Sequence, residues 1–257
     1  MTKHSDRDIR MKQFEHAHRV VFDPQDYIII RLDGKAFHSY TRNMNRPYDT
    51  GFIRAMDETL MFLCEQIQGV RFGYTQSDEI SLLLTSWTDT SVRKLKTHPE
   101  LWMGGVKAKL DSLSASLATG KFNTIESRGN KKDIAFFDSR SFTLPTEDAV
   151  KDYFEWRYSD CVRNSISMTA QTYFSAKKLH GVNLKRQREM LEEIGKPWED
   201  ASLRFMYGGC VKKTTPIPGQ QDPTTLEQIR SSWDIYYPTS TFNIKNMMPI
   251  PSKTWWD

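Results

Sequence analysis

A largely apolar, β-branched run covers residues 27–32 and leads into Asp33 and Gly34. Such a run is typical of a buried strand, and the glycine ends it. Over residues 50–68, apolar side chains recur at spacings of three and four positions. That spacing predicts an amphipathic helix, which Gly69 stops.

Two more strand-like runs, residues 69–74 and 80–84, come after this helix and are separated by a short polar turn. Paired runs of this kind predict a β-hairpin, with Asp78 and Glu79 at its tip. If the hairpin lies beside the first strand, the carboxylates of Asp33 and Asp78 converge.

A second helix is predicted over about residues 101–118, because apolar side chains again share one face and Gly120 follows. At least one more strand is predicted within residues 134–144. The elements then follow the order β-α-β-β-α-β, the split βαβ arrangement. We therefore expect an α+β fold with a ferredoxin-like antiparallel sheet and two helices on one face. This is the palm found in many nucleotide polymerases and cyclases.

After Pro145 the pattern becomes mainly helical. A long helical pattern, with Thr146 as a plausible N-cap, continues to Gly181, and a shorter helix is predicted over residues 183–194. The remaining residues are expected to form loops and short strands packed on these helices. The expected organisation is a single catalytic unit over 1–257, with a palm-like catalytic core over 25–145 and a mainly helical extension over 146–257.

Composition describes an ordinary soluble protein, with 38% hydrophobic and 26% charged residues. No apolar run is long enough to span a membrane, and the first residues lack the apolar core of a signal peptide. We therefore expect a cytoplasmic protein with no membrane partner. Cys64, Cys161 and Cys210 lie far apart without a Cys-x-x-Cys pair, which predicts reduced packing residues rather than a disulfide framework or a zinc site.

The net charge of +4 is mild. It stays positive even though the proposed site is acidic, so the positive charge lies elsewhere on the chain. The densest basic cluster consists of Lys177, Lys178, Lys185, Arg186 and Arg188. Such a cluster could attract a polyanion. A basic cluster is more often a solvated helix face than a nucleic-acid site, so both interpretations stay open at the level of sequence.

The carboxylates at the strand end and the hairpin tip are the candidate chemistry. Converging carboxylates on rigid strands suit Mg²⁺, which is normally held by one or two carboxylates plus substrate phosphates. This arrangement points to phosphate chemistry assisted by two metal ions. Taken singly, an Asp-Gly pair or a Ser-Asp-Glu tip is more often a plain turn. Their occurrence in the order strand, helix, hairpin favours a metal site.

Four motifs occur in order along the chain. Residues 31–38 are similar to R-(L/I/V)-D-G-x-x-F-H, and residues 74–81 to Y-x-Q-S-D-E-x-S. Residues 137–140 are similar to F-D-(G/S)-R, and residues 153–161 to Y-(L/F)-x-W-R followed by D-C. Together they resemble the tRNA(His) guanylyltransferase superfamily, whose enzymes add nucleotides to the 5′ end of RNA in the 3′-to-5′ direction.

The resemblance implies roles for residues at the matching positions. Asp33 and Asp78 would hold two Mg²⁺ ions with the carbonyl of Gly34, and Glu79 would be a third acidic group near the metals. The implied nucleotide-binding residues are Gly34, Lys35, Ala36, Phe37 and His38 through their backbone, Ser77 and Lys109 at phosphate, and Arg46 and Asp49 near the base. Arg46 stands where the family usually has lysine, and the two side chains are not equivalent. The expected RNA-binding residues are Arg140, Trp156, Arg157, Asn164, Lys177, Lys178 and Arg186.

One departure separates two branches of that superfamily. Enzymes dedicated to tRNA(His) usually carry His-Ile-Asn-Asn after the D-C pair, whereas this chain has Val162-Arg163-Asn164-Ser165. The loss resembles the guanylyltransferase-like branch, whose members copy a template base and repair 5′-truncated tRNAs.

The expected activity is therefore templated 3′-5′ addition to tRNA with a truncated 5′ end. ATP would activate a 5′-monophosphate, with GTP and other NTPs as further substrates, in a homotetramer. The alternatives are a tRNA(His) guanylyltransferase that adds G at position −1, a nucleotidyl cyclase, and a noncatalytic RNA-binding protein.

Overall fold

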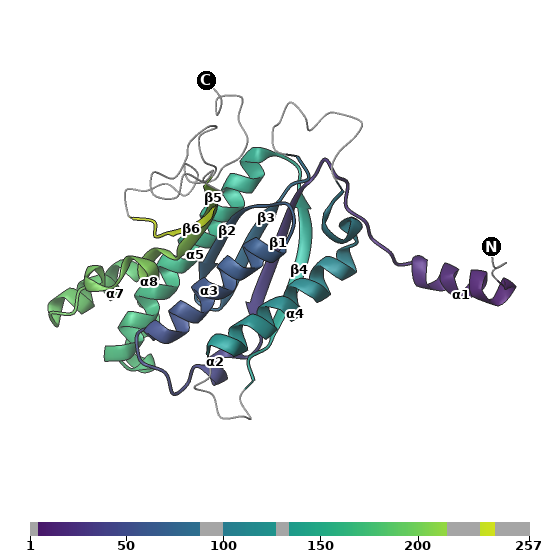
Figure 1. The fold of residues 1–257 in the computed structure, drawn as a ribbon. Helices are drawn as coiled ribbons and strands as arrows, with labels where there is room; N and C mark the ends of the chain where they lie inside the picture. The colour runs from purple at the N-terminus through teal and green to yellow at the C-terminus, as the bar shows by residue number, and fades with distance from the viewer. Residues whose placement is uncertain (1–4, 88–99, 127–133, 215–231, 240–257) are drawn as a thin grey trace, which may run out of the picture.

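A six-stranded antiparallel sheet forms the centre of the molecule, in the strand order β4-β1-β3-β2-β5-β6 (Figure 1). The computed structural model describes residues 5–87, 100–126, 134–214 and 232–239. The strands are β1 (Tyr27–Gly34), β2 (Val70–Gln76), β3 (Glu79–Leu84), β4 (Phe137–Leu144), β5 (Gly209–Thr214) and β6 (Ser232–Tyr236).

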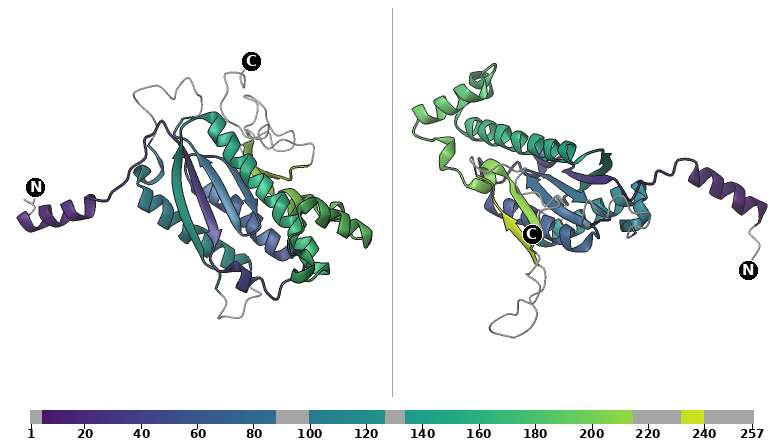
Figure 2. Two further views of the ribbon diagram at one scale, coloured as in Figure 1. Left: turned by 180° about the vertical axis from the view of Figure 1, so that it is seen from behind. Right: turned by 90° about the horizontal axis from the view of Figure 1, so that it is seen from above.

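Helices cover both faces of this sheet (Figure 2). They are α1 (Asp6–His16), α2 (Phe37–Tyr40), α3 (Thr50–Gln66), α4 (Lys107–Ile125), α5 (Glu147–Tyr173), α6 (Ala176–Leu179), α7 (Leu184–Glu193) and α8 (Leu203–Tyr207), with 3-10 turns at Trp102–Gly105 and Trp198–Asp200. Helices α3 and α4 pack on one face, and α5 lies across the other (Figure 2).

The alternation of side chains along β1 explains the two layers. Ile28, Ile30 and Leu32 belong to the core beneath α3 and α4, whereas Tyr27 and Ile29 belong to the core beneath α5. Successive side chains of a strand point to opposite faces, so a fully apolar strand is covered on both. The predicted α+β fold is confirmed. Its palm strands have the spatial order β4-β1-β3-β2 of the split βαβ arrangement, with α3 and α4 as the two connecting helices.

The second helix of the palm differs from its prediction. It begins at Lys107 and passes through Gly120 to end at Ile125. A glycine inside a helix costs only about 1 kcal/mol relative to alanine. Burial of Ala118 and Phe122 on either side of the glycine offsets that cost.

The C-terminal part of the chain also differs from its prediction. Strand β5 pairs with β2, and β6 pairs with β5, so these segments extend the palm sheet, and both also contact α3. The edge of β2 would otherwise present a row of unpaired backbone groups, and β5 satisfies them. Residues 215–231 and 240–257 of the expected extension lie outside the described part of the chain.

Helix α1 stands apart from the sheet (Figures 1 and 2), and none of its residues is buried. Within the described ranges, we find no helix whose length and apolar content would let it cross a membrane.

Candidate active site

The end of β1 and the β2–β3 hairpin tip meet at one point. The backbone amide of Gly34 donates to the carbonyl of Asp78 at 3.1 Å. Asp33 lies opposite Glu79 in the register of β1 and β3. Ser77 adopts a left-handed conformation, with φ of 48°, that closes the tight turn. The predicted convergence of Asp33 and Asp78 is confirmed.

The electrostatics of this point favour a bound cation. Burial raises the pKa of Asp78, and the nearby negative charge of Asp33 raises it further, whereas the backbone amide and the Ser77 hydroxyl act in the opposite direction. Within the described residues, no group of three or more His, Cys, Asp and Glu side chains is arranged around a common metal position. Two carboxylates and the Gly34 carbonyl still fit Mg²⁺, because phosphate and water oxygens normally complete its shell.

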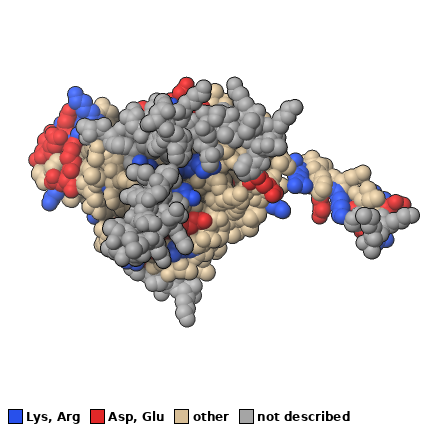
Figure 3. Space-filling view, turned by 45° about the horizontal axis from the view of Figure 1, so that its top comes forward, with Lys and Arg blue, Asp and Glu red and all other residues tan. Residues whose placement is uncertain are grey.

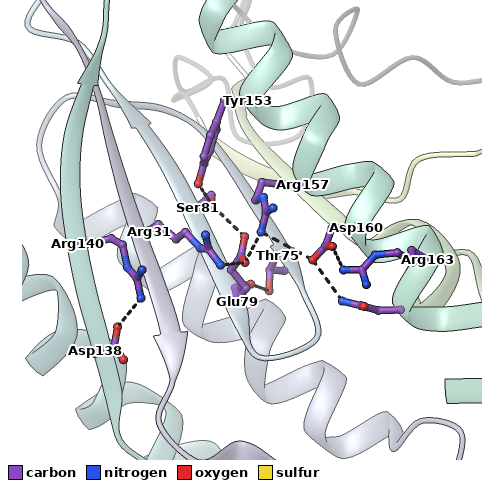
Figure 4. A network of polar contacts seen from close by, with 11 residues as sticks. Arg31, Thr75, Glu79, Ser81, Asp138, Arg140, Tyr153, Arg157, Asp160 and Arg163 are labelled. Carbon is purple, nitrogen blue, oxygen red and sulfur yellow. Dashed lines mark hydrogen bonds and ion pairs between the residues drawn. The ribbon is translucent and has the colours of Figure 1, made fainter. Parts of the chain in front are cut away.

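The Glu79 carboxylate forms ion pairs with two guanidinium groups (Figure 4). Its Oε2 lies 2.8 Å from Nη2 of Arg31 and 3.0 Å from Nη1 of Arg157. Burial raises the pKa of Glu79, and the two arginines counter it by favouring the charged form. The family resemblance implied that Glu79 is a third acidic group near the metals. In the structure its charge is neutralised internally, and it joins β1, β3 and α5.

Two predicted RNA-binding residues, Trp156 and Arg157, have different environments. Arg157 is 3% exposed, so it does not offer its guanidinium to RNA as expected. It instead supports Trp156, whose ring centroid lies 3.3 Å from the guanidinium carbon. The Trp156 side chain is 55% exposed. Arg140 is also exposed, and its contact with Asp138 is long at 3.4 Å (Figure 4). Trp156 and Arg140 thus remain surface candidates.

A cavity of about 330 Å³ opens beside the hairpin tip, between the start of α3 and the middle of α5. Seven predicted site residues line it: Phe37, His38, Arg46, Asp49, Ser77, Asp78 and Asn164. The fold thus brings residues from four separate segments to one cavity. The Nδ2 of Asn164 also donates to Asp160 at 3.4 Å, which orients the amide on α5.

In the loop after β1, the backbone of Gly34 lies close to the ring of Phe37. A Cβ at Gly34 would lie 2.4 Å from the ring of Phe37, which leaves room only for glycine. The Phe37 side chain is buried, so this residue can reach a ligand only through its backbone. The amide of Lys35 already donates to the carbonyl of Phe136 at 2.8 Å and is not the free phosphate donor that was expected. Phe37 and His38 are the first two residues of α2, so their backbone amides have no carbonyl partner within that helix.

Asp49 is occupied by local hydrogen bonds. Its Oδ1 accepts from the amides of Gly51 and Phe52, both at 3.0 Å, which makes it the N-cap of α3. Its Oδ2 accepts from Nδ2 of Asn45 at 3.2 Å. Asp49 therefore fixes the cavity wall that its neighbours form, and its expected contact with the base stays a prediction.

Lys109 lies away from the cavity. It is exposed near the start of α4, next to Val106, which pairs with Val21. The other end of α4 is the one near the site, because Phe122 packs against Phe37. At about 1.5 Å per residue, Lys109 lies about 20 Å along the helix from Phe122. Lys109 is therefore not among the residues that line the cavity of this chain. Its distance from the cavity follows from the direction of α4, which the local sequence did not reveal.

Arg204 also lines the cavity, and no sequence pattern pointed to it. Its Nε donates to Oδ1 of Asp57 at 2.7 Å, and the two residues are 147 positions apart. Phe205 stacks on Tyr48, with ring centroids 4.6 Å apart. No local pattern marks contacts across such separations, so only charge type and apolar character were available as signals.

The basic cluster after α5 is largely compensated by acids. Arg186 contacts Glu189 at 3.2 Å and Glu193 at 2.7 Å, and Arg188 pairs with Glu199. Figure 3 shows acidic and basic side chains mixed at the left end of the molecule, where α7 lies. Lys177 and Lys178 are exposed on α6. The cluster is closer to a solvated helix face than to a continuous basic patch.

Comparisons with known proteins give consistent matches. Residues 8–145 match the family model described as tRNAHis guanylyltransferase. A bacterial tRNA(His) guanylyltransferase-like protein solved with ATP has a TM-score of 0.76 and 35% identity, covering 89% of this chain and 90% of that one. Such a bacterial protein solved with GTP has a TM-score of 0.74 and 33% identity, covering 91% and 93%. The tRNA(His) guanylyltransferase of Saccharomyces cerevisiae is 28% identical, covering 80% of this chain and 90% of that protein.

Proposed function

This chain belongs to the tRNAHis guanylyltransferase family of nucleotidyltransferases, and we propose that it repairs tRNA by adding nucleotides to a truncated 5′ end. Each addition runs in the 3′-to-5′ direction and copies the opposite base. The observation that carries the proposal is the meeting of Asp33 and Asp78 beside a cavity of about 330 Å³. The bound ATP and GTP of the bacterial relatives support a nucleotide as its occupant.

The proposed reaction has two phosphoryl transfers. In the first, an oxygen of the RNA 5′-monophosphate attacks the α-phosphate of ATP, and pyrophosphate leaves. In the second, the 3′-hydroxyl of the incoming NTP attacks the activated 5′-phosphate, and AMP leaves. When bound, Mg²⁺ supplies neutralisation of phosphate charge and a lower hydroxyl pKa.

The chain's own residues bind and orient the reactants. Asp33, Asp78 and the Gly34 carbonyl would hold Mg²⁺ through their oxygen atoms. His38 and Ser77 line the cavity next to Asp78, where the phosphates of a nucleotide would lie. Fixed groups around a reacting phosphate raise the rate mainly by positioning it and by stabilising developing charge.

The preference for repair over identity-setting guanylation rests on the segment Val162-Arg163-Asn164-Ser165. Asn164 and Ser165 line the cavity, whereas Arg163 is exposed and pairs with Asp160. Exposed Trp156 offers a flat surface on which an unpaired base can stack. A homotetramer is the assembly that the resemblance implies, and a cytoplasmic location is the expectation from the sequence. Both belong to this proposal.

The test is incorporation of labelled nucleotide into a tRNA that lacks its first 5′ residue, with Mg²⁺, ATP and each NTP in turn. We expect the added nucleotide to match the opposite base. Asp78→Asn should abolish incorporation, because it removes a metal-binding charge. Asp148→Asn is the matched control: this carboxylate is 90% exposed at the start of α5, and the variant should retain activity.

Other outcomes would contradict the proposal in distinct ways. Addition of G alone to tRNA(His), whatever base lies opposite, would identify the tRNA(His) guanylyltransferase activity of the yeast relative. Cyclisation of ATP or GTP without addition to RNA would identify a cyclase. RNA binding without magnesium-dependent turnover would identify a noncatalytic protein.

A further inference from the structure

One wall of the cavity is formed by a helix that is too short to be stable by itself. Helix α8 has five residues, and two of them, Arg204 and Phe205, line the cavity of about 330 Å³. Phe205 stacks on Tyr48, which lines the same cavity, with ring centroids 4.6 Å apart. Isolated helices shorter than about 12–15 residues are marginal in water. The position of this aromatic wall therefore depends on contacts that α8 makes with other elements.

Contacts from strand β2 and helix α5 hold the end of α8. The carbonyl of Tyr207 accepts from the Tyr74 hydroxyl at 2.9 Å, and the carbonyl of Met206 accepts from the Ser165 hydroxyl at 3.4 Å. Such hydrogen bonds between neutral groups contribute about 0.5–1.5 kcal/mol each, whereas those to charged groups contribute more. The stronger contact on α8 is therefore the charged one that Arg204 makes with α3.

That contact is made by Asp57, which is 8% exposed and is not among the residues that line the cavity. Its Oδ1 accepts from Nε of Arg204 at 2.7 Å, and its Oδ2 accepts from the Tyr237 hydroxyl at 3.3 Å. The backbone of Gly209 packs on the pair so closely that an added Cβ would lie 3.0 Å from Nε of Arg204. A buried ion pair adds little net stability, but separating its partners leaves an uncompensated charge. It can therefore fix one arrangement of the elements that it joins.

We propose that Asp57 is a positioning residue for the nucleoside part of the ligand. Through Arg204 it fixes Phe205, and with it the aromatic wall, without contacting the ligand itself. The inference rests on the proposed function, in which a nucleotide occupies the cavity. Aromatic and apolar walls bind flat organic rings, whereas the phosphates lie at Asp33 and Asp78. Asp57 should therefore affect binding of the nucleoside and not binding of the phosphates.

The first measurement is equilibrium binding of ATP and of inorganic triphosphate to the full chain, with Mg²⁺ and without RNA. The dissociation constant of triphosphate divided by that of ATP gives the nucleoside contribution to binding. Asp57→Asn should lower this contribution about tenfold, because the uncompensated guanidinium turns toward water and displaces Phe205. Triphosphate should bind no more weakly than to the parent protein, since loss of a negative charge does not disfavour a polyanion.

The matched control is Glu58→Gln, at the next residue of α3. Glu58 pairs with Arg54 at 3.3 Å, and both side chains are exposed. Exposed ion pairs contribute little, so the nucleoside contribution should stay at the parent value in this variant.

A double-mutant cycle tests whether Asp57 acts through Arg204. Arg204→Met should also lower the nucleoside contribution, because it leaves the Asp57 carboxylate without its counter-charge. Combining Arg204→Met with Asp57→Asn removes both charges, so the double variant should lose less than the two single losses together. Additive losses would show that the two residues act independently and would overturn the inference.

Tyr237→Phe decides if Asp57→Asn does not fold. The Tyr237 residue is 45% exposed, and the variant removes one hydrogen bond from Asp57 while the ion pair stays. The nucleoside contribution should fall about threefold, as expected for the loss of one hydrogen bond to a charged group.

Three other results would overturn the inference. They are an unchanged nucleoside contribution in the deciding variant, an equal loss of ATP and triphosphate binding, and equal affinity of the parent protein for both ligands. Templated addition to RNA with an unchanged nucleoside contribution would overturn this inference alone. A lowered nucleoside contribution in a protein whose parent adds nothing to RNA would overturn the proposed function alone.

Discussion

At the scale of single residues, buried charges surround the carboxylates that we propose as ligands of Mg²⁺. Glu79 directly follows Asp78 in the chain, and both Glu79 and its partner Arg157 are about 4% exposed as side chains. A buried ion pair adds little net stability compared with apolar residues, but removing one partner leaves an uncompensated buried charge. Glu79 is thus a positioning residue that ties the hairpin tip to α5.

Glu79→Gln should lower the free energy of unfolding by about 3 kcal/mol, because the buried guanidinium of Arg157 and the partly exposed guanidinium of Arg31 lose their counter-charge. The measurement is a denaturant unfolding curve. Glu147→Gln is the matched control: Glu147 pairs with Lys151 at the surface, so its loss should cost less than about 1 kcal/mol. Equal stability of Glu79→Gln and the parent protein would show that the ion pairs do not hold the hairpin.

The three cysteines should be unreactive in the native protein. Burial raises the pKa of Cys161 to about 12 and moves the pKa values of Cys64 and Cys210 in the same direction. The thiolate is the reactive form, so labelling by iodoacetamide at pH 8 should be slow until the chain unfolds. Mass spectrometry of the labelled protein checks this. Rapid native labelling of all three thiols would contradict it.

At the scale of secondary-structure elements, glycines have opposite roles in two places. Gly34 ends β1 against the ring of Phe37, whereas Gly120 lies inside α4, where an added Cβ would meet no atom within 4 Å. The first glycine allows a close approach that shapes the loop beside Asp33. The second only weakens its helix.

Alanine substitutions should therefore change stability in opposite directions. Gly34→Ala should lower the free energy of unfolding by about 1–3 kcal/mol through overpacking and weaken nucleotide binding, because its amide positions Asp78. Gly120→Ala should raise the free energy of unfolding by up to about 1 kcal/mol and leave binding intact. Paired unfolding curves and ATP titrations measure both. A stabilised Gly34→Ala protein would refute the packing argument.

At the scale of the whole molecule, the palm depends on the C-terminal half of the chain. Helix α5 covers one face of the sheet, where Phe154 packs edge-on against Phe72 with ring centroids 4.9 Å apart. Strand β5 covers the open edge of β2. The division of the chain at residue 145 stays a prediction. The packing indicates that residues 25–145 depend on α5 and β5 for their stability.

A fragment of residues 25–145 should fail to unfold cooperatively, because it exposes the apolar face that α5 buries and the edge that β5 pairs. Near-ultraviolet circular dichroism during thermal unfolding is the measurement. A fragment of residues 5–239 retains every described element and serves as the control, with one sharp transition expected. A sharp transition in the shorter fragment would show that the palm folds alone.

The sequence by itself determined the order of the palm elements, the helix N-cap at Thr146 and the meeting of Asp33 with Asp78. These follow from local causes: side-chain periodicity, capping and turn chemistry act over a few residues, and a hairpin brings its own tip to a neighbouring strand.

Only the tertiary structure decided which charges are internal and which face the cavity. It buried Arg157 against Glu79, set Lys109 at the distant end of α4, and joined Arg204 to Asp57 across 147 positions. It also added β5 to the sheet. Such contacts depend on which element faces pack together and in which direction each element runs. Periodicity along the chain specifies that a face is apolar, but not which partner will cover it.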